Sequence, residues 1–452
     1  MPQTFLCKAT LVTLVLVSVF LQPGLAQSRP VTIRLAGDEW FLDSLTKTGM
    51  IAVFEKQSGV KVDVLHKNDR TIMNELDHGP ASADEALDVL VMRHRLLGAL
   101  IQKGQVRPID SLLGDPTLHD TIFLPQQQLI PNWWRELSTY ENHIYGYPFT
   151  SLTTYLCYRK DLLDDPAKQR NFRARYHRDL KPPSTWAEYL QLAEFFNRPD
   201  EHFYGTYIQG EQGLALWYEW LNLIYSFGGT ILDTQHGWEY GDIAVNSPQN
   251  VAATEQYVKL IAFSPPDTLK YGWGEAQSAL QQGRVFMGLL WNDQAPFLED
   301  PAVSKVTGKI GYSLIPSNTG KPFSQLEGLT YLIPTESKHP HEAYRFLEWA
   351  MSAQVQIQQT LKGSSSARIS TYDEPKVKDV PYTSTFLASV PVAIPKPTIP
   401  ESADMTDAMD RHLSDIVNGR NSPQAGLDSL ALELQRLLGN KARLRYPIKA
   451  TR

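Results

Sequence analysis

The 452-residue sequence contains only two cysteines, Cys7 and Cys157, which excludes a fold held together by several disulfides. Cys7 lies in a segment typical of a secretory signal peptide, where Lys8 precedes an apolar run at residues 11–21 and Ala26 ends a Gly-Leu-Ala cleavage site. We expect cleavage after Ala26, which would leave Cys157 without an intramolecular partner. Because Cys157 lies in an apolar run, we also expect it to be buried and unreactive.

Long apolar runs are scarce as well. The run at residues 11–21 is shorter than the ~20 residues that a membrane-spanning helix needs. No cysteine follows Ala26 as the attachment site of a lipoprotein. A signal peptide over residues 1–26 therefore predicts an exported, soluble protein, which we place in a bacterial periplasm.

Dense positive charge and catalytic motifs are missing too. The net charge is −6 and Lys and Arg form no dense stripe, which argues against nucleic acid as a partner. There is no His-Glu-x-x-His, no Gly-x-Ser-x-Gly, no phosphate-binding glycine loop and no paired-cysteine spacing. We therefore predict no catalytic residue, no metal and no cofactor. A glycoside hydrolase needs only two carboxylates across a cleft, so the 49 acidic residues leave an exported glycoside hydrolase as an alternative.

The chain is too long for one hydrophobic core, and its N-terminal part alternates between strand and helix patterns. Strands are predicted at residues 31–35, 60–65 and 87–92, with a helix between the first two and helical polar residues before the third. This alternation predicts a parallel sheet, whose strands end at one rim. Residues 38–40, 66–69 and 93–95 should therefore converge there.

Residues 283–293 form the stretch most informative about function. Residues 276–282 have helical composition, Gly283 is placed to end that helix, and residues 285–290 form a short apolar strand. Trp291, Asn292 and Asp293 follow at the carboxyl end of this strand, where ligands bind in open α/β sheets. A flat aromatic ring beside planar hydrogen-bonding groups suits a polyhydroxylated ring, although Trp291 could instead be a core residue.

Coarser patterns fill in the rest of the chain. A capping box at Thr185 and Glu188 opens a helix to residue 196, and further helices are predicted at residues 214–227, 341–351 and within 404–438. Strands are predicted at 309–316 and 329–333. The Pro-rich residues 390–400 are interpreted as a surface connection.

Several landmarks occur in order along nearly the whole chain, and their joint spacing carries a family resemblance. They are FEKQSGV at 54–60, DVLV at 88–91, YGYP at 145–148, YRKDL at 158–162, PSTWAE at 183–188, GG at 228–229, QGRVFM at 282–287 with Trp291, EAYRFLE at 342–348 and GSSSAR at 363–368. With these, the chain resembles the sugar-binding, maltose-binding-protein-like family 1 of bacterial extracellular solute-binding proteins of ABC importers.

The resemblance implies an α/β fold of the two-lobed periplasmic binding protein type (type II-like), with a ligand cleft between lobes joined by a multi-segment hinge. Lobe one would comprise residues 27–147 and 313–350, and lobe two residues 148–312 and 351–452. The chain would cross between the lobes near 147–148, near 311–316 and after Met351. Arg93-His94-Arg95 departs from the family, which often has an acidic residue at that point of the cleft.

Candidate ligand-binding residues come from both lobes. In lobe one we expect Trp40 to form a platform, with Asp38 or Glu39 as hydrogen-bond acceptors, although these carboxylates could instead cap the following helix. Further lobe-one candidates are Asp69, His94 and Glu327, the last placed in a loop before the strand at 329–333. In lobe two we expect Trp291 with Asn292 or Asp293, and the remaining candidates are Trp217, Trp273 and Arg368. A core role competes for Trp217 and Trp273, and a surface ion pair for Arg368, which ends a loop that approaches the cleft in this family.

The resemblance thus implies the substrate-binding component of an ABC transporter, a monomer that captures a sugar, polyol or related polyhydroxylated solute. Its partners would be the ligand and the permease subunits in the inner membrane. A sensor-only binding protein is a further alternative, because the fold does not decide function by itself.

Overall fold

The computed structural model describes residues 30–79, 82, 85–118 and 128–449, so the expected signal peptide lies outside the described residues. The N-terminal lobe contains the predicted parallel sheet, in the order β3-β1-β2. Its strands are β1 (Thr32–Gly37), β2 (Lys61–His66) and β3 (Val89–Arg93). The helices that connect and follow them are α1 (Glu39–Thr46), α2 (Met50–Ser58), α3 (Asp69–His78) and α4 (Leu97–Gln102). The register brings the carboxyl ends of all three strands to one rim, as predicted.

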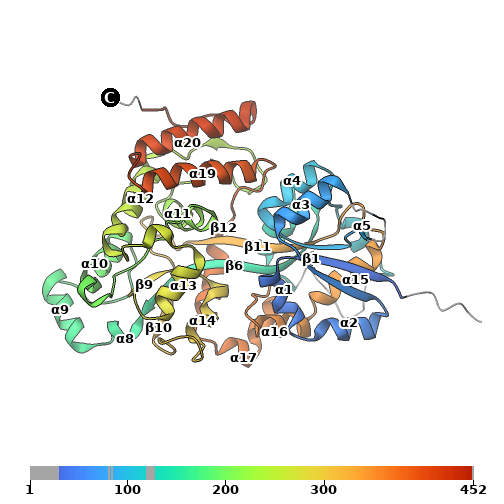
Figure 1. Ribbon diagram of the computed structural model, residues 1–452, viewed down its shortest axis with the longest axis horizontal. Helices are drawn as coiled ribbons and strands as arrows, with labels where there is room; N and C mark the ends of the chain where they lie inside the picture. Colours follow the sequence, from blue (N-terminus) through green and yellow to red (C-terminus); the bar gives the residue numbers. More distant parts are fainter. Residues whose placement is uncertain (1–29, 80–81, 83–84, 119–127, 450–452) are drawn as a thin grey trace, which may run out of the picture.

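Two long strands connect this lobe to the second one (Figure 1). The first half of β6 (Gly146–Arg159) pairs with β11 (Ser324–Leu332), which in turn pairs with β3. The second half of β6 pairs with β9 (Met287–Trp291) and β10 (Ile310–Ser313). One eight-stranded sheet therefore runs through both lobes.

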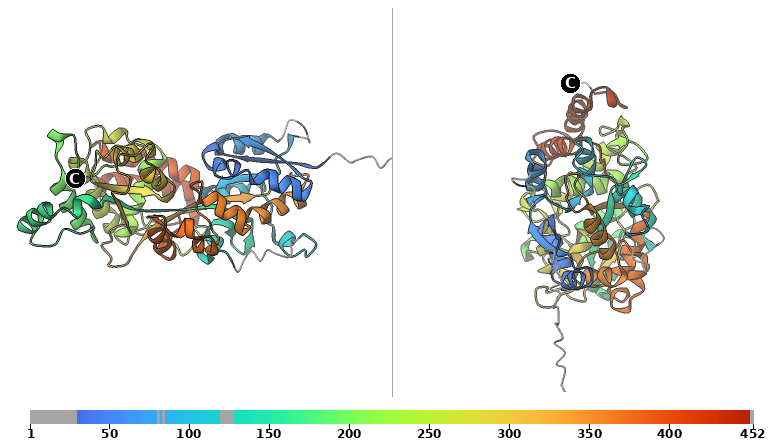
Figure 2. Two further views of the ribbon diagram at one scale, coloured as in Figure 1. Left: turned by 90° about the horizontal axis from the view of Figure 1, so that it is seen from below. Right: turned by 90° about the vertical axis from the view of Figure 1, so that its right-hand side faces the viewer.

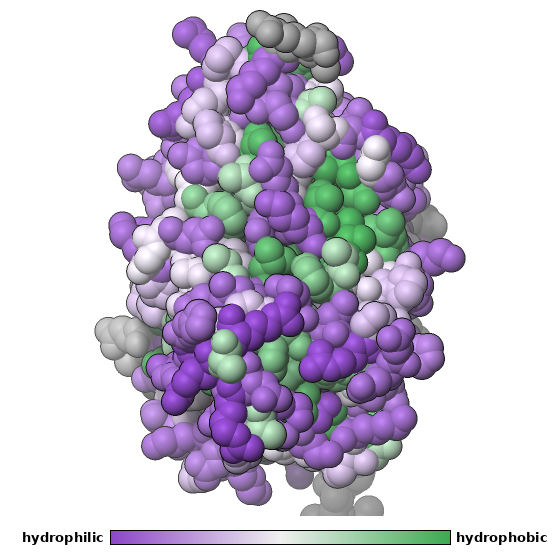
Figure 3. Space-filling model, turned by 90° about the vertical axis from the view of Figure 1, so that its left-hand side faces the viewer, coloured by the Kyte–Doolittle hydropathy of each residue, from purple (hydrophilic) through white to green (hydrophobic). Residues whose placement is uncertain are grey.

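Helices cover the second lobe (Figure 1). They are α8 (Lys160–Leu163), α9 (Pro166–Tyr176), α10 (Trp186–Phe196), α11 (Leu214–Ser226), α12 (Pro248–Leu260), α13 (Trp273–Gln281), α14 (Ala295–Glu299), α19 (Ser402–Val417) and α20 (Pro423–Leu438). Every residue of α11 except Leu214 is buried, because α12 and α19 pack against it. Gly283 has φ +67°, the left-handed conformation expected of a helix stop. The end of this lobe presents mainly hydrophilic side chains, with apolar ones gathered in its upper half (Figure 3).

The remaining helices and strands include α7 (Pro131–Ser138) and α18 (Thr383–Ser389), which pack on β6. The others include α5 (Asp110–Leu113), β4 (Thr139–Tyr140), β5 (His143–Ile144), β7 (Leu232–Asp233), β8 (Asp242–Ile243), α15 (Pro340–Ala350), α16 (Ala353–Thr360), α17 (Pro375–Lys378) and β12 (Ala393–Ile394). Figure 2 shows the resulting elongated shape, with β1–β3 towards one end and α9 and α10 towards the other. Cys157 is buried, as expected. None of the described helices is long and apolar enough to cross a membrane.

Two predictions from the sequence are wrong. Glu327 and Gly328 lie inside β11 rather than in a loop before it. The Glu327 carboxylate is held by His94 and Lys396, and Gly328 leaves room for Leu137 and the Thr150 backbone, so neither residue follows the apolar pattern of a buried strand. The Pro-rich stretch is not a surface connection. Within it β12 pairs with β11, while Lys396 and Ile399 are completely buried.

Candidate functional site

A cavity of about 340 Å³ lies where the strand ends of the two lobes meet. It is built from the ends of β1, β3 and β9, from β6 and β11, and from helices α11 and α13. Its lining residues are Asp38, Trp40, Phe41, Arg93, Leu152, Tyr218, Trp273, Gly274, Gln277, Trp291, Asp293, Gln294 and Glu327. Both lobes therefore contribute to one site.

The lobe-one wall begins with Asp38, which has two tasks. It caps α1 by accepting a hydrogen bond from the backbone N–H of Trp40 at 3.0 Å, and it lines the cavity. The cap fixes the start of the helix and so places the Trp40 side chain, which is 53% exposed. The Trp40 ring stacks on Phe297 of lobe two, 5.6 Å between centroids, and its Nε1 lies 3.4 Å from Asp293 Oδ2.

Arg93 is the cation of the lobe-one wall. Its Nη1 lies 2.6 Å from Asp69 Oδ2, and its guanidinium lies over the Phe41 ring at 5.4 Å. Burial alone would lower the pKa of Arg93, but the charge and hydrogen bond of Asp69 outweigh it and raise the pKa above its ordinary value. Arg93 is therefore a permanent cation that already has a carboxylate partner.

The lobe-two wall is aromatic. Trp291 ends β9 and is 7% exposed, and the Tyr218 ring meets it edge to face at 5.6 Å and 84°. The Trp273 ring lies 6.1 Å from Tyr218, and Trp217 stacks behind Tyr218 at 4.3 Å inside the core. Such rigid rings offer flat apolar surface at little cost in conformational entropy.

Two polar atoms of cavity-lining residues are buried and have no hydrogen-bond partner: the acceptor Asp293 Oδ1 and the donor Trp273 Nε1. Leaving such groups unpaired costs free energy, so a ligand that supplies both partners gains affinity. Burial raises the pKa of Asp293 to about 6, and the hydrogen bond from Trp40 opposes this shift. At neutral pH Asp293 is thus an acceptor for a hydroxyl group.

The floor of the cavity is the carboxylate of Glu327 on β11. Its Oε1 accepts from His94 Nδ1 at 2.7 Å, and its Oε2 accepts from the Tyr218 hydroxyl and from Lys396 Nζ, the latter at 2.9 Å. Burial raises the pKa of Glu327, but Lys396 and His94 outweigh it, and the pKa lies well below its ordinary value. The floor is a charged but fully paired group.

The structure separates the predicted residues into three sets. The residues that line the cavity are Asp38, Trp40, Trp273, Trp291, Asp293 and Glu327. The residues that contact a lining residue from behind are Asp69, His94 and Trp217. The residues that lie away from it are Glu39, Asn292 and Arg368.

Each of these last three has other contacts. Glu39 is exposed and lies 4.0 Å from His66. Asn292 turns to the opposite side of its strand end, where its Oδ1 accepts from Thr153 N at 2.7 Å. Arg368 Nε donates to Ser370 Oγ at 3.1 Å, in the 3-10 helix that follows its loop.

Sequence reasoning missed four prominent members of the site: Phe41, Arg93, Tyr218 and Lys396. Arg93 lies in the converging strand ends and could have been chosen with His94. Phe41 follows Trp40 directly. Tyr218 lies within an almost entirely apolar helix, and Lys396 lies in a Pro-rich stretch, so neither carries a local signal.

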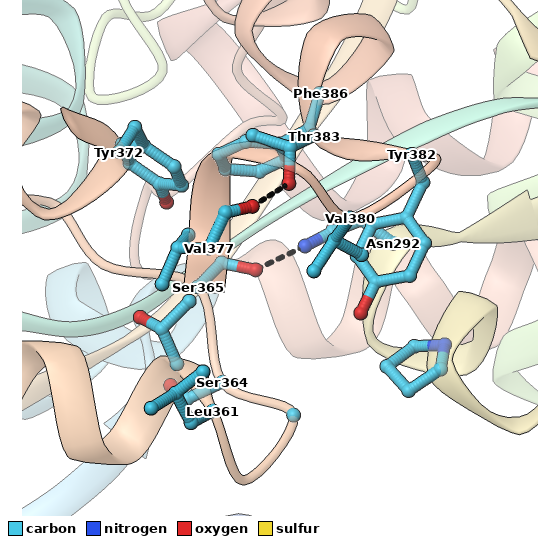
Figure 4. A pocket seen from close by; sticks show the side chains of 13 residues that line it. Asn292, Leu361, Ser364, Ser365, Tyr372, Val377, Val380, Tyr382, Thr383 and Phe386 are labelled. Carbon is cyan, nitrogen blue, oxygen red and sulfur yellow. Dashed lines mark hydrogen bonds between the residues drawn. The ribbon is translucent and has the colours of Figure 1, made fainter. Parts of the chain in front are cut away.

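A second cavity, of about 120 Å³, lies on the other side of Asn292 (Figure 4). Its hydrogen bonds are internal, from Asn292 Nδ2 to Ser365 Oγ and from Thr383 Oγ1 to the Val377 carbonyl. Among the described residues, none of its lining side chains has a buried polar atom without a partner. Its lining offers no comparable unmet hydrogen bonds, and the larger cavity is the better candidate.

Across the described ranges, no group of three or more His, Cys, Asp or Glu residues is arranged to hold a metal ion.

Comparisons with known proteins show the family and the fold of the chain. The family profile described as bacterial extracellular solute-binding protein matches residues 38–357. The mannitol-binding protein of Pseudomonas aeruginosa is 26% identical over 299 residues, which are 64% of this chain and 62% of that protein. The chain thus matches somewhat less than two thirds of that relative's length.

Solved structures extend the similarity over the whole fold. A solute-binding protein of an ABC transporter from Agrobacterium radiobacter K84, in complex with ribitol, is 26% identical with a TM-score of 0.76, covering 90% of this chain and 98% of that one. The maltose-bound MalE3 of T. maritima has the same fold at 20% identity, with a TM-score of 0.75 and coverage of 90% and 100%.

Proposed function

This chain belongs to the bacterial extracellular solute-binding proteins, and on that premise we propose that it captures a small, uncharged sugar or polyol for an ABC importer. The two lobes close on the ligand in the periplasm, and the closed complex delivers it to permease subunits in the inner membrane. Lobe one comprises residues 27–147 and 313–350 and lobe two residues 148–312 and 351–452 in this proposal, and the protein acts as a monomer.

The observation that carries the proposal is the unpaired donor and acceptor beside an aromatic wall. A polyhydroxylated ligand has hydroxyls that donate to Asp293 Oδ1 and accept from Trp273 Nε1. Its apolar C–H groups pack on Trp40, Tyr218 and Trp291, which line the same cavity. Few soluble metabolites combine both properties as sugars and polyols do.

The charges around the cavity support an uncharged ligand. Arg93 is paired with Asp69 and Lys396 with Glu327, so each of these cations already has a carboxylate partner. His94, the middle residue of the basic Arg93-His94-Arg95 group, is hydrogen-bonded to the same Glu327 carboxylate at 2.7 Å. An anionic ligand would have to compete with these carboxylates for Arg93 and Lys396.

The volume supports a short ligand. A cavity of about 340 Å³ is at the lower end of the ~300–1,000 Å³ range of small-molecule sites. It suits one sugar ring or one linear polyol rather than an oligosaccharide. The relatives named above are described with mannitol, ribitol and maltose.

The glycoside hydrolase alternative is less well supported. Of the cavity carboxylates, Glu327 is held by four donors and so has no free lone pair with which to act as acid, base or nucleophile. We therefore propose binding without turnover. A sensor-only binding protein would use the same site. It would differ only in the membrane protein that binds its closed form.

A thermal-shift screen tests the proposal with ribitol, D-mannitol, D-glucose, maltose and D-gluconate. We expect an uncharged monosaccharide or polyol to raise the melting temperature, since a hundredfold excess over Kd stabilises the folded state by ~2.7 kcal/mol. A shift with gluconate alone would overturn the charge argument. Recovery of cleaved sugar would favour the hydrolase, and no shift with any of these compounds would refute the ligand class.

A further inference from the structure

One lysine is buried completely beneath the proposed ligand cavity. Lys396 follows β12, and none of its side chain is exposed. Its Nζ lies 3.1 Å from Gln325 Oε1, 3.1 Å from the Leu326 carbonyl oxygen and 2.9 Å from Glu327 Oε2. An ammonium group has three N–H donors, so all three are used. Burying a charge costs free energy even when the charge is fully paired, which points to a specific role for this lysine.

The lysine also touches the aromatic wall. Its ammonium lies 4.2 Å from the centre of the Tyr218 ring and 5.3 Å from that of Trp291. Cations attract the faces of such rings, most strongly where water is excluded. Lys396 thus contacts the aromatic wall of the cavity and its floor at once, although it does not line the cavity itself.

Glu327 is saturated by the protein. Its Oε1 accepts from His94 Nδ1 at 2.7 Å and from the Gly328 backbone N–H at 3.0 Å, and its Oε2 accepts from Lys396 and from the Tyr218 hydroxyl. A carboxylate has about four lone-pair sites, and four donors fill them. Glu327 therefore offers the ligand no acceptor, and its contribution is to hold the Tyr218 hydroxyl from below.

We propose, on the basis of the proposed function, that Lys396 is a positioning residue for the ligand cavity. Its ammonium neutralises Glu327 and fixes Tyr218 and Trp291, so that the floor is uncharged as a whole and the aromatic wall is set before the ligand arrives. Asp293 and Trp273 then form the hydrogen bonds to the ligand. Lys396 and Glu327 do not contact the ligand, and they hold the aromatic rings in place around it.

The groups around Lys396 define a pH test. Glu327 on β11, Tyr218 on α11 and the η2 residues His94 and Arg95 (η2, His94–Leu96) face it or act on it electrostatically. Burial lowers the pKa of Lys396 to about 8, although Glu327 opposes this shift. The pKa of Tyr218 is raised well above its ordinary value, by burial first and then by Glu327, whereas that of Glu327 lies well below. Among Lys396, Tyr218 and Glu327, therefore, only Lys396 titrates between about pH 7 and 10.

The experiment compares the wild type with Lys396→Met, with Glu327→Gln and with the double variant Glu327→Gln/Lys396→Met. Lys376→Met, on the exposed side of α17, is the matched control. Ribitol and D-mannitol are titrated calorimetrically from pH 6.5 to 9.5, and melting temperatures are recorded alongside. The double variant leaves no buried charge behind, so it keeps the fold even where a single variant does not.

If Lys396 positions the wall, wild-type affinity falls as the pH rises through about 8, by about tenfold in total, and the control follows the wild type. The double variant recovers thermal stability but binds about tenfold more weakly at pH 7, and its affinity does not change with pH in this range. A double variant with wild-type affinity, or a wild-type profile that stays flat to pH 9.5, would overturn the proposal.

A second readout requires no ligand. Protein labelled with 5-fluorotryptophan gives a ¹⁹F resonance for Trp291, which is assigned by Trp291→Phe. That resonance should move as Lys396 titrates in the wild type and stay fixed in the double variant. If the wild type binds neither polyol, the ligand class fails while this resonance still decides the role of Lys396, and a resonance that does not move in the wild type refutes it.

Discussion

The indole nitrogen of Trp40 lies 3.4 Å from Asp293 Oδ2, which joins helix α1 to the end of a strand in the other lobe. The same Trp40 ring stacks on Phe297 in α14, six residues beyond the end of β9. Trp40 therefore holds the two lobes together at the mouth of the cavity. Because over half of its surface is exposed, its burial contributes little to the fold itself.

Replacing Trp40 by Ala should weaken ribitol binding about tenfold while changing the free energy of unfolding by less than ~1 kcal/mol. Trp40→Phe keeps a ring against Phe297 but loses the N–H donor, so an intermediate affinity is expected. Calorimetric titration and urea unfolding measure the two quantities. Leu432→Ala on α20, which is also partly exposed, is the control. Wild-type affinity in Trp40→Ala would show that the contact between the lobes is irrelevant to binding.

The pH dependence of ligand binding should depend on Asp293. Its pKa is raised from 3.8 to about 6, mainly by burial, and the ligand hydroxyl needs the carboxylate form. We expect the affinity of the wild type to fall as the pH drops through about 6, and Asp293→Asn to bind more weakly with no such fall. Calorimetry between pH 4.5 and 7.5 tests this. If the affinity of the asparagine variant falls at acid pH as it does in the wild type, another group is responsible for the titration.

Asp293 also affects stability in a defined direction. Since its folded pKa is higher than the unfolded value of 3.8, its contribution is fully present below about pH 4 and is lost as the pH rises through about 6.

Glu219 gives a separate prediction for stability, away from the ligand. Its carboxylate is buried in lobe two, where it accepts from Gln209 N at 2.6 Å and from the Tyr257 hydroxyl at 2.7 Å. Burial raises its pKa from 4.5 to about 7. The folded state therefore favours the protonated acid, and the stability that this contributes is present below about pH 4.5 and lost as the pH rises through 7.

Relative to Glu219→Gln, the wild type should lose roughly 2–4 kcal/mol of unfolding free energy between pH 4.5 and 8. Chemical denaturation at each pH measures the difference. Parallel curves for the two proteins would mean that Glu219 stays ionised throughout.

The ion pair of Asp69 with Arg93 should be much more important for stability than a comparable surface pair. Asp69→Ala leaves Arg93 as a largely buried cation without a partner, at a cost of about 3 kcal/mol. Asp63→Ala breaks the more exposed pair with Arg34 in the same sheet and should cost less than ~1 kcal/mol. Urea unfolding compares the two variants. Equal costs would show that Arg93 finds another partner or water.

Much of lobe one could be predicted from the sequence because its signals are local. Alternating apolar residues define β1 and β2, and the parallel order then brings Asp38, Asp69 and Arg93 to one rim without further information. The position of Trp291 at the end of a strand follows in the same way, from the helix stop and the short apolar strand before it. Periodicity and strand direction are enough for this part of the site.

The rest of the site depends on contacts that no local pattern shows. The sequence predicts a loop at Glu327 because a carboxylate followed by a glycine interrupts the apolar pattern of a strand. Both residues are nevertheless required in the strand by partners that are distant in the sequence. Gly328 is required where Leu137 and the backbone of Thr150 approach too closely for a side chain. Lys396 is buried because Glu327 neutralises it, although 68 intervening residues separate them. Such pairs are set by tertiary packing alone.

The 14-residue strand β6 has a consequence for folding. It gives its first half to the sheet of lobe one and its second half to that of lobe two, without a break in the strand. A fragment containing one lobe would therefore either lack a central strand or carry an unpaired edge that invites aggregation. We expect the two lobes to unfold together in a single cooperative transition, and neither to be stable when expressed alone.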